Sequence, residues 1–249
     1  MKKKIKIATY GGGVNSTAMI LLLMEQEIKL DYIVFADTGG EKPNTYEYIK
    51  YFNSYLVDKL YTPIKIIKRS DKTKSIDDTL RDEIIRRETL PAIAFGFKTC
   101  SLKWKVEPSD RYIKSILKKE QYPYIKYVGY DTDEEHRIKK TVYPKYELRY
   151  PLIDAEFDRA DCKKYIEKCG LKVPPKSSCY FCPSMKGYEI IELQKQYPEL
   201  LTDALAIEKN AMPNLDTVKG LGRTKSWDSI IQQQVINFEP IQKDCGCKD

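Results

Sequence analysis

The chain has 249 residues, and 42% of them are hydrophobic, which is enough to enclose a full core. Its longest apolar stretch, residues 18–24, is far shorter than the roughly 20 residues that span a bilayer, so we expect a cytoplasmic protein with no membrane partner. The net charge of +7, from 43 basic and 36 acidic side chains, permits a polyanionic partner without requiring one. Because we also expect no export signal, the seven cysteines should stay reduced, which leaves metal binding, redox catalysis or burial as their uses.

Strand and helix patterns alternate over the first 130 residues. Runs rich in apolar and β-branched residues predict strands at 4–10, 32–36, 65–68 and 125–130. Helical periodicity predicts helices at 16–26, 43–60, 76–87 and 108–119, the first of them capped by Asn15 or Ser16. This alternation predicts an α/β fold, in which a parallel sheet carries helices on both faces.

The pattern changes near residue 155. Residues 150–153 are expected to end the regular core, and helices are predicted at 159–169, 187–196, 198–212 and 227–236. We therefore expect two regions: an α/β domain at 1–155, and a helical, cysteine-bearing C-terminal cap at 156–249.

A glycine-rich turn joins the first predicted strand to the first predicted helix. Backbone N–H groups and the positive end of a helix converge at such a turn, and glycines let an anionic group approach the backbone closely. The side chains that follow add hydroxyl donors, so a phosphate or sulfate group fits there. The alternative is a tight turn with a purely structural role. The candidate binding residues are Gly11, Gly12, Gly13, Asn15, Ser16 and Thr17.

Two cysteines at Cys-x-x-Cys spacing, Cys179 and Cys182, can grip one soft metal ion, either zinc or the iron of an iron–sulfur cluster. Two further ligands would complete the site, and buried or uncoordinated thiols are the alternative. The residues available for this role are Cys100, Cys162, Cys169, Cys245 and Cys247.

Five segments resemble, in order, the motifs of PP-loop enzymes of the phosphoadenylylsulfate (PAPS) reductase-like group, related to DNA-phosphorothioation sulfurtransferases. Residues 10–17 are similar to the Ser-Gly-Gly-x-Asp-Ser loop, and 35–48 to the second strand with its Asp-Thr-Gly turn and Thr-Tyr-Glu helix. Residues 99–103 resemble the Cys-Thr-x-x-Leu-Lys segment, 129–137 the Gly-x-x-x-Asp-Glu-x-x-Arg motif, and 178–183 the Cys-x-x-Cys-Pro motif. The resemblance covers about residues 5 to 230.

The resemblance implies a Rossmann-like (HUP-type) domain that binds ATP, or PAPS, with Mg²⁺. It places Asp37, Thr38 and Gly129 with the glycine-rich turn around the nucleotide, and it implies catalytic roles for Asp37, Lys103 and Arg137. It also favours Cys100 and Cys162 as the remaining ligands of a zinc ion or iron–sulfur cluster. Related enzymes adenylate their substrates, thiolate RNA, sulfurate DNA or reduce sulfonucleotides, so tRNA or DNA is an expected acceptor, with a sulfur donor or a thioredoxin-like protein as a partner.

The loop departs from this family pattern at two positions. Gly11 stands where the pattern has its first serine, and Asn15 stands where it has aspartate. An asparagine cannot offer a carboxylate to Mg²⁺, which prefers carboxylate oxygen, so ATP cleavage is in doubt unless Asp37 holds the metal instead.

The C-terminal sequence Asp244-Cys245-Gly246-Cys247 resembles the Glu-Cys-Gly-Leu-His tail whose cysteine attacks sulfate in sulfonucleotide reductases. Three functions follow from these patterns. The leading one is adenylation-coupled sulfur transfer to a nucleic acid. The second is thiol-dependent PAPS reduction through Cys245, and the third is nucleotide binding without catalysis.

Overall fold

The computed structural model describes residues 4–70, 76–97, 99–138 and 143–238. The chain folds into two compact units. Unit 1 comprises residues 1–80 and 101–179, and unit 2 comprises 81–100 and 180–249. This division differs from the boundary expected near residue 155, because the helix Arg159–Lys168 and the segment up to Cys179 belong to the sheet-containing unit.

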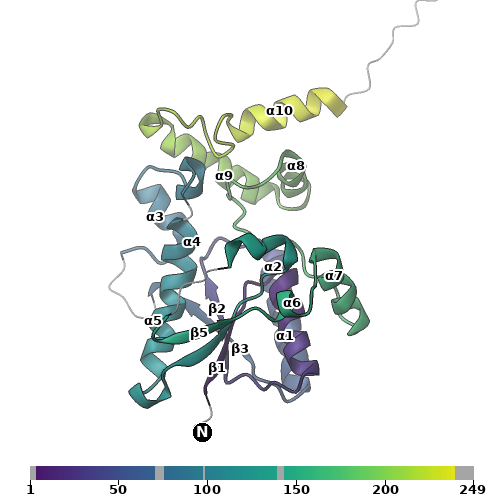
Figure 1. Ribbon diagram of the computed structural model, residues 1–249. Helices are drawn as coiled ribbons and strands as arrows, with labels where there is room; N and C mark the ends of the chain where they lie inside the picture. The colour runs from purple at the N-terminus through teal and green to yellow at the C-terminus, as the bar shows by residue number, and fades with distance from the viewer. Residues whose placement is uncertain (1–3, 71–75, 98, 139–142, 239–249) are drawn as a thin grey trace, which may run out of the picture. The chain divides into compact units, whose positions relative to one another are not determined.

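Unit 1 is built on five parallel strands in the order β3-β2-β1-β4-β5 (Figure 1). The strands are β1 (Lys6–Thr9), β2 (Tyr32–Asp37), β3 (Ile64–Lys68), β4 (Tyr124–Tyr127) and β5 (Tyr146–Arg149). The first four match the predicted strands, whereas β5 was not predicted. The all-parallel sheet confirms the expected α/β, Rossmann-like fold.

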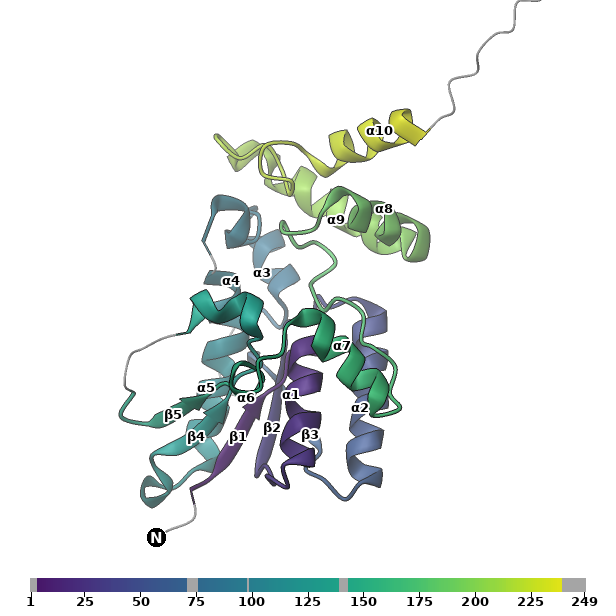
Figure 2. The same cartoon turned by 45° about the vertical axis from the view of Figure 1, so that its right-hand side comes forward.

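Alternate residues of the strands supply the cores on the two faces of the sheet. Ala8 and Phe35 belong to a large core with α1 (Val14–Glu25), α2 (Pro43–Asp58), α6 (Pro151–Asp154) and α7 (Arg159–Lys168). Ile7 and Val34, their sequence neighbours, pack with α5 (Glu107–Ile116) on the other face. Period-two side-chain alternation explains this arrangement, and the views in Figures 1 and 2 agree with it.

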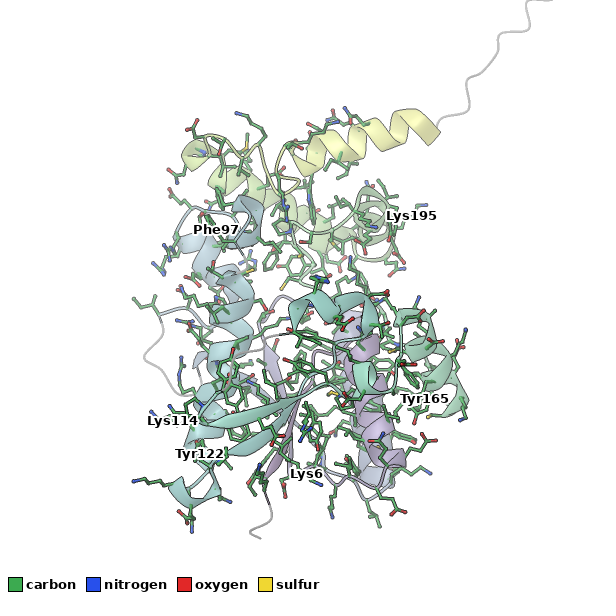
Figure 3. The ribbon with its side chains drawn as sticks, viewed as in Figure 1. Lys6, Phe97, Lys114, Tyr122, Tyr165 and Lys195 are labelled. Carbon is green, nitrogen blue, oxygen red and sulfur yellow. The ribbon has the colours of Figure 1, made fainter. Side chains whose placement is uncertain are left out.

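Polar contacts fasten the helices of unit 1 to one another. The hydroxyl of Tyr165 on α7, labelled in Figure 3, donates to Glu25 Oε2 at the end of α1 (2.9 Å).

Short helical turns complete unit 1. Before α5 the chain forms a short helix α4 (Thr99–Ser101) and a π-helical turn η3 (Leu102–Val106), which buries Trp104. The chain between β4 and β5 includes the 3₁₀ turn η5 (Thr132–Arg137).

Unit 2 is helical. Its elements are α3 (Leu80–Arg86), which begins at the unit boundary, η2 (Ala92–Phe95), α8 (Gly187–Gln196), α9 (Pro198–Ala211), η6 (Met212–Asn214) and α10 (Trp227–Phe238). Arg81 pairs with Asp203 on α9. The Asp203 carboxylate also accepts a 2.5 Å hydrogen bond from the Tyr180 hydroxyl. Glu208 is buried and accepts the backbone N–H groups of Leu221 and Trp227 (2.6 and 3.0 Å). In the described part of the chain, no helix is both long and apolar enough to cross a membrane.

Candidate nucleotide site

The candidate site lies at the carboxyl ends of β1, β2 and β4 in unit 1. Strand β1 lies between β2 on one side and β4 on the other, so the chain order reverses between β1 and β4. Open parallel sheets bind ligands at such a switch point, in the crevice beyond the carboxyl ends of the strands. The glycine-rich loop leaves β1 at this point, and Gly129 follows β4 there.

Backbone geometry explains the glycines of the loop. Gly12 has a φ of +73°, a conformation that side chains disfavour, and a Cβ added there would lie 3.2 Å from the Thr45 methyl group. Gly13 is the N-cap of α1, and it makes no side-chain cap hydrogen bond. The expected cap at Asn15 or Ser16 is therefore wrong. Instead, the Ser16 hydroxyl accepts from Gly11 N (3.2 Å) and donates to Gly13 O (3.1 Å), so it holds the loop closed on itself.

Gly129 contacts the first turn of α1. A Cβ at this position would lie 3.0 Å from Ser16 Cα and 3.1 Å from both Asn15 O and Ser16 N. Because these are backbone atoms, they cannot swing aside as the end of a side chain can. The structure thus brings Gly129 against the glycine-rich loop, as the motif pattern implied.

Asn15 bonds to charged side chains of three separate residues. Its amide Nδ2 donates to Asp131 Oδ2 (2.6 Å) and to Glu134 Oε2 (3.1 Å). Its Oδ1 accepts from Arg159 on α7 (3.1 Å). Asp131 is 1% exposed, and this burial raises the pKa of its carboxyl group, while the Asn15 hydrogen bond opposes the rise.

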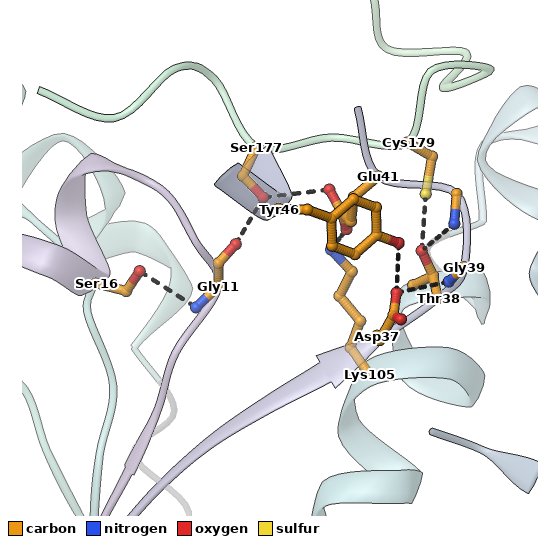
Figure 4. Close-up of polar contacts among 11 residues, drawn as sticks. Gly11, Ser16, Asp37, Thr38, Gly39, Glu41, Tyr46, Lys105, Ser177 and Cys179 are labelled. Carbon is orange, nitrogen blue, oxygen red and sulfur yellow. Dashed lines mark hydrogen bonds and ion pairs between the residues drawn. The ribbon is translucent and has the colours of Figure 1, made fainter. Parts of the chain in front are cut away.

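Asp37 and Thr38 form a braced turn after β2 (Figure 4). Asp37 Oδ1 accepts from Gly39 N (2.8 Å) and from the Tyr46 hydroxyl (2.6 Å). Burial and the Asp37 carboxylate raise the pKa of Tyr46, so its hydroxyl remains a donor at neutral pH. Gly39 has a φ of +70°, and a Cβ there would overlap the side chain of Thr79.

A strap formed by residues 177–179 connects these turns (Figure 4). The Ser177 hydroxyl lies 2.6 Å from Gly11 O and 3.3 Å from Glu41 Oε2. The Glu41 side chain is fully buried, and its other oxygen accepts from Lys105 Nζ (2.6 Å). Cys179 forms an isolated β-bridge with Glu41, and its sulfur lies 3.3 Å from Thr38 Oγ1. The first cysteine of the Cys-x-x-Cys sequence is therefore fixed at the carboxyl end of β2.

The two predicted catalytic cations lie on the turns η3 and η5. Lys103 lies on η3, half-buried, and its backbone carbonyl accepts from Arg69 (2.9 Å). Arg137 ends η5, pairs with Glu134, and places its guanidinium carbon 4.3 Å from the centre of the Tyr130 ring. Tyr130 in turn stacks on Tyr150 (5.8 Å).

The predicted metal ligands are divided between the two units. Cys162 and Cys179 belong to unit 1, whereas Cys100 and Cys182 belong to unit 2. Cys162 is fully buried in the hydrophobic core, and burial raises the pKa of its thiol to about 12. Within the described ranges, no group of three or more Cys, His, Asp or Glu side chains is arranged to hold a metal ion. The predicted catalytic residue Cys245 lies outside the described residues.

Several residues that build the site were not predicted as site residues. Tyr46 was matched only as part of the Thr-Tyr-Glu helix, and Lys105 and Arg159 look like surface cations in the sequence. Their partners lie 9, 64 and 144 positions away in the chain. Ser177, two residues before Cys179, stands beside a motif that could have drawn attention to it.

A protein-family model matches more than half of the chain. No curated protein matches the chain. A solved structure, the U34-tRNA thiolase NcsA from Methanococcus maripaludis with its 4Fe-4S cluster, is similar with 13% identity and a TM-score of 0.47, over 93% of this chain and 82% of that chain. Residues 6–173 match the model of the phosphoadenosine phosphosulfate reductase domain. This match covers more than half of the sequence, and the matched region contains the parallel sheet and its glycine-rich first loop. The chain therefore belongs to the phosphoadenosine phosphosulfate reductase domain family of the PP-loop superfamily.

Proposed function

We propose that this protein binds an adenine nucleotide, ATP in the first instance, with Mg²⁺ and uses it for adenylation-coupled sulfur transfer to a nucleic acid. An oxygen of the acceptor attacks the α-phosphorus of ATP, and pyrophosphate leaves. Sulfur then attacks the carbon that bears the adenylated oxygen, and AMP leaves. Family members are sulfurtransferases or reductases, so both steps lie within the chemistry of the family.

The observation that carries this proposal is the loop Gly11–Gly13 at the β1/β4 switch point. A helix of 12 residues begins directly after it, so the positive end of the α1 dipole points at the loop. The contact with Gly129 leaves no room for a side chain between the loop and β4, which fixes the loop backbone before any ligand arrives. Pre-organised N–H donors of this kind stabilise charge that develops on phosphate oxygens.

Other residues have roles that follow from their positions. Asp37 lies at the carboxyl end of β2, where its carboxylate can bind Mg²⁺ or the ribose, and Gly39 and Tyr46 fix its orientation. Lys103 and Arg137 are the cations proposed to neutralise the departing group. Thr38 contributes a hydroxyl beside Cys179.

The charge distribution supports a nucleic-acid acceptor. Unit 1 contains 31 Lys and Arg residues against 23 Asp and Glu, whereas unit 2 contains 12 against 13. The positive charge of the protein thus resides in the unit that carries the candidate nucleotide site. A net positive charge on this unit favours a polyanion such as tRNA or DNA.

The cysteine centre is proposed to contain the Cys-x-x-Cys pair, Cys179 and Cys182. When bound there, an iron–sulfur cluster or zinc ion would hold sulfide from the sulfur donor and present it to the activated acceptor. Cys179 lies 3.3 Å from Thr38 Oγ1 and belongs to the strap whose Ser177 contacts Gly11, which supports a thiol near the proposed nucleotide.

The test uses protein purified without oxygen and supplied with ATP·Mg²⁺, a sulfide donor and bulk tRNA or DNA. Formation of AMP and pyrophosphate that requires the nucleic acid supports the proposal, and sulfur-containing nucleosides in the digested product identify the acceptor. No AMP with any acceptor, despite tight ATP binding, would instead indicate a binding protein without catalysis.

The family match itself favours a second candidate, reduction of a sulfonucleotide. In that reaction a thiolate, proposed as Cys245, attacks the sulfur of PAPS and releases adenosine bisphosphate, and a thioredoxin-like protein reduces the thiosulfonate and releases sulfite. Incubation with PAPS and reduced thioredoxin distinguishes the two candidates. Sulfite that disappears in the Cys245→Ser variant supports reduction, whereas ATP cleavage retained in that variant supports the first candidate.

A further inference from the structure

The residue that departs from the family loop pattern, Asn15, is the one that connects the loop to the chain after β4. It lies in the first turn of α1 and is 8% exposed. Its partners Asp131 and Glu134 belong to the segment that follows β4, and Arg159 belongs to α7. One side chain therefore joins three parts of unit 1 at the edge of the candidate site.

The charges around Asn15 require a neutral side chain that can donate. Both contacts of its Nδ2 are to carboxylates, at 2.6 and 3.1 Å. An aspartate at this position would place a third carboxylate within hydrogen-bond distance of Asp131 and Glu134, in place of the amide group that donates to both. Carboxylates at that separation repel one another strongly where water is excluded, and Asp131 is nearly inaccessible.

The contact continues from Asn15 to a proposed ligand-binding cation. Glu134 accepts from Asn15 through Oε2 and from Arg137 through Oε1. Asp131 caps the same turn, because its Oδ1 accepts from Glu134 N (3.2 Å). Asn15 therefore restrains both the start of η5 and the carboxylate that orients the Arg137 guanidinium.

We propose that Asn15 is a positioning residue, a neutral link that holds the turn Thr132–Arg137 and its Arg137 guanidinium against the phosphate loop. The part of this inference that concerns ligand binding rests on the proposed nucleotide function, whereas the link itself does not. On this account Asn15 is not an impaired Mg²⁺ ligand. The asparagine and the acidic pair Asp131 and Glu134 form one unit, and restoring the aspartate of the family pattern would disrupt it.

The experiment compares Asn15→Asp with the exchanged pair Asn15→Asp/Asp131→Asn, in the full-length protein. In the exchanged pair, the amide introduced at position 131 can donate to the carboxylate introduced at position 15, and the amide oxygen can still cap η5. This restores the shorter of the two contacts, at 2.6 Å, and leaves the 3.1 Å contact with Glu134 unpaired, so recovery should be incomplete. Asn53→Asp is the matched control, since it adds the same charge where the side-chain oxygen already accepts from Ile64 N (2.7 Å). Amide hydrogen exchange of residues 132–138 is measured without ligand, and ATP affinity by calorimetry.

Asn15→Asp should accelerate amide exchange in residues 132–138 and weaken ATP binding about tenfold. The exchanged pair should recover ATP affinity to within about threefold of the wild-type value, as expected for directly coupled residues. Asn53→Asp should leave exchange in these residues unchanged. Exchange that is unaffected by Asn15→Asp, or that the exchanged pair does not restore, overturns the link. A gain of ATP affinity or pyrophosphate release in Asn15→Asp also overturns it. If the wild-type protein binds no nucleotide, the proposed function fails, while the exchange data still decide the link.

Discussion

The hydroxyl of Ser177 donates a 2.6 Å hydrogen bond to the carbonyl oxygen of Gly11, and these two residues are 166 positions apart in the chain. Through this contact, the segment that carries Cys179 is attached to the loop that is proposed to hold phosphate. The Glu41–Lys105 pair supports the same strap from the β2 side. A nucleotide and a thiol can therefore be held by one set of contacts within unit 1.

Replacing Ser177 with alanine should loosen this strap. The segment would lose its contacts with Gly11 and Glu41, so Cys179 should open to solvent more often and react faster. We expect the rate of Cys179 alkylation by iodoacetamide, followed by peptide mass spectrometry, to rise about threefold or more. The exposed Ser184→Ala variant serves as the control. Equal rates in wild-type protein and Ser177→Ala would show that the contact does not restrain the cysteine.

Gly129→Ala should weaken nucleotide binding. Its new methyl group would press on backbone atoms of Asn15 and Ser16, and displacing the loop by a few tenths of an ångström would misalign the N–H donors. We expect ATP affinity to fall about tenfold, as for other losses of preorganised anion contacts. Gly170→Ala is the control for the general effect of a lost glycine. No atom lies within 4 Å of the added Cβ there, and the φ of +76° makes this substitution costly to the backbone far from the loop. ATP affinity that falls equally in both variants would contradict a specific role for Gly129.

Cys162 should prove structural. Serine at this position would bury a hydroxyl in an apolar core, which costs about 1–3 kcal/mol of unfolding free energy. Metal and sulfide content of anaerobically purified Cys162→Ser should equal that of the wild-type protein, whereas Cys179→Ser and Cys182→Ser should lose it. If Cys162→Ser loses metal while it retains its thermal stability, the ligand role first expected for Cys162 would be restored.

The Arg81–Asp203 pair makes stability depend on pH in the acidic range. The Arg81 hydrogen bonds, and then that from Tyr180, lower the pKa of Asp203 below its ordinary value. A lowered pKa stabilises the folded state above the unfolded pKa of about 3.9, and this stabilisation is lost as pH falls through the folded pKa. The difference in unfolding free energy between wild-type protein and Asp203→Asn should therefore stay constant above about pH 5 and shrink below about pH 4. Urea titrations across this range measure it, and a difference that grows on acidification would contradict the assignment.

Local patterns predicted the elements that carry strong periodicity or capping signals. The helix α2, with its proline in the first turn, begins at the predicted Pro43, and β2 begins at the predicted Tyr32. The strand β5 was missed because it has four residues at the edge of the sheet, none of them fully buried, so its apolar alternation is weak. Propensity cannot reveal such a strand, which forms because β4 offers a pairing partner.

The site was predictable where the residue type itself reflects the local backbone conformation. Gly12 and Gly39 adopt left-handed conformations that explain their residue type, so a sequence pattern can find them. The bonds of Asn15 to Asp131 and Arg159 were not predictable, because they depend on which surfaces the fold brings together. The packing of Cys162 was likewise not predictable from the sequence. The family resemblance favoured it as a ligand, but its helix face packs into the core.

The central claim is that the loop between β1 and α1 is an anion cradle for a nucleotide. A crystal structure of the protein with Mg²⁺ and an ATP analogue that resists cleavage between the α- and β-phosphates tests it most directly. We predict phosphate oxygens within hydrogen-bond distance of the Gly12 and Gly13 amides and of the Ser16 hydroxyl. A polyphosphate bound elsewhere, with this loop closed by neighbouring side chains, would contradict the account.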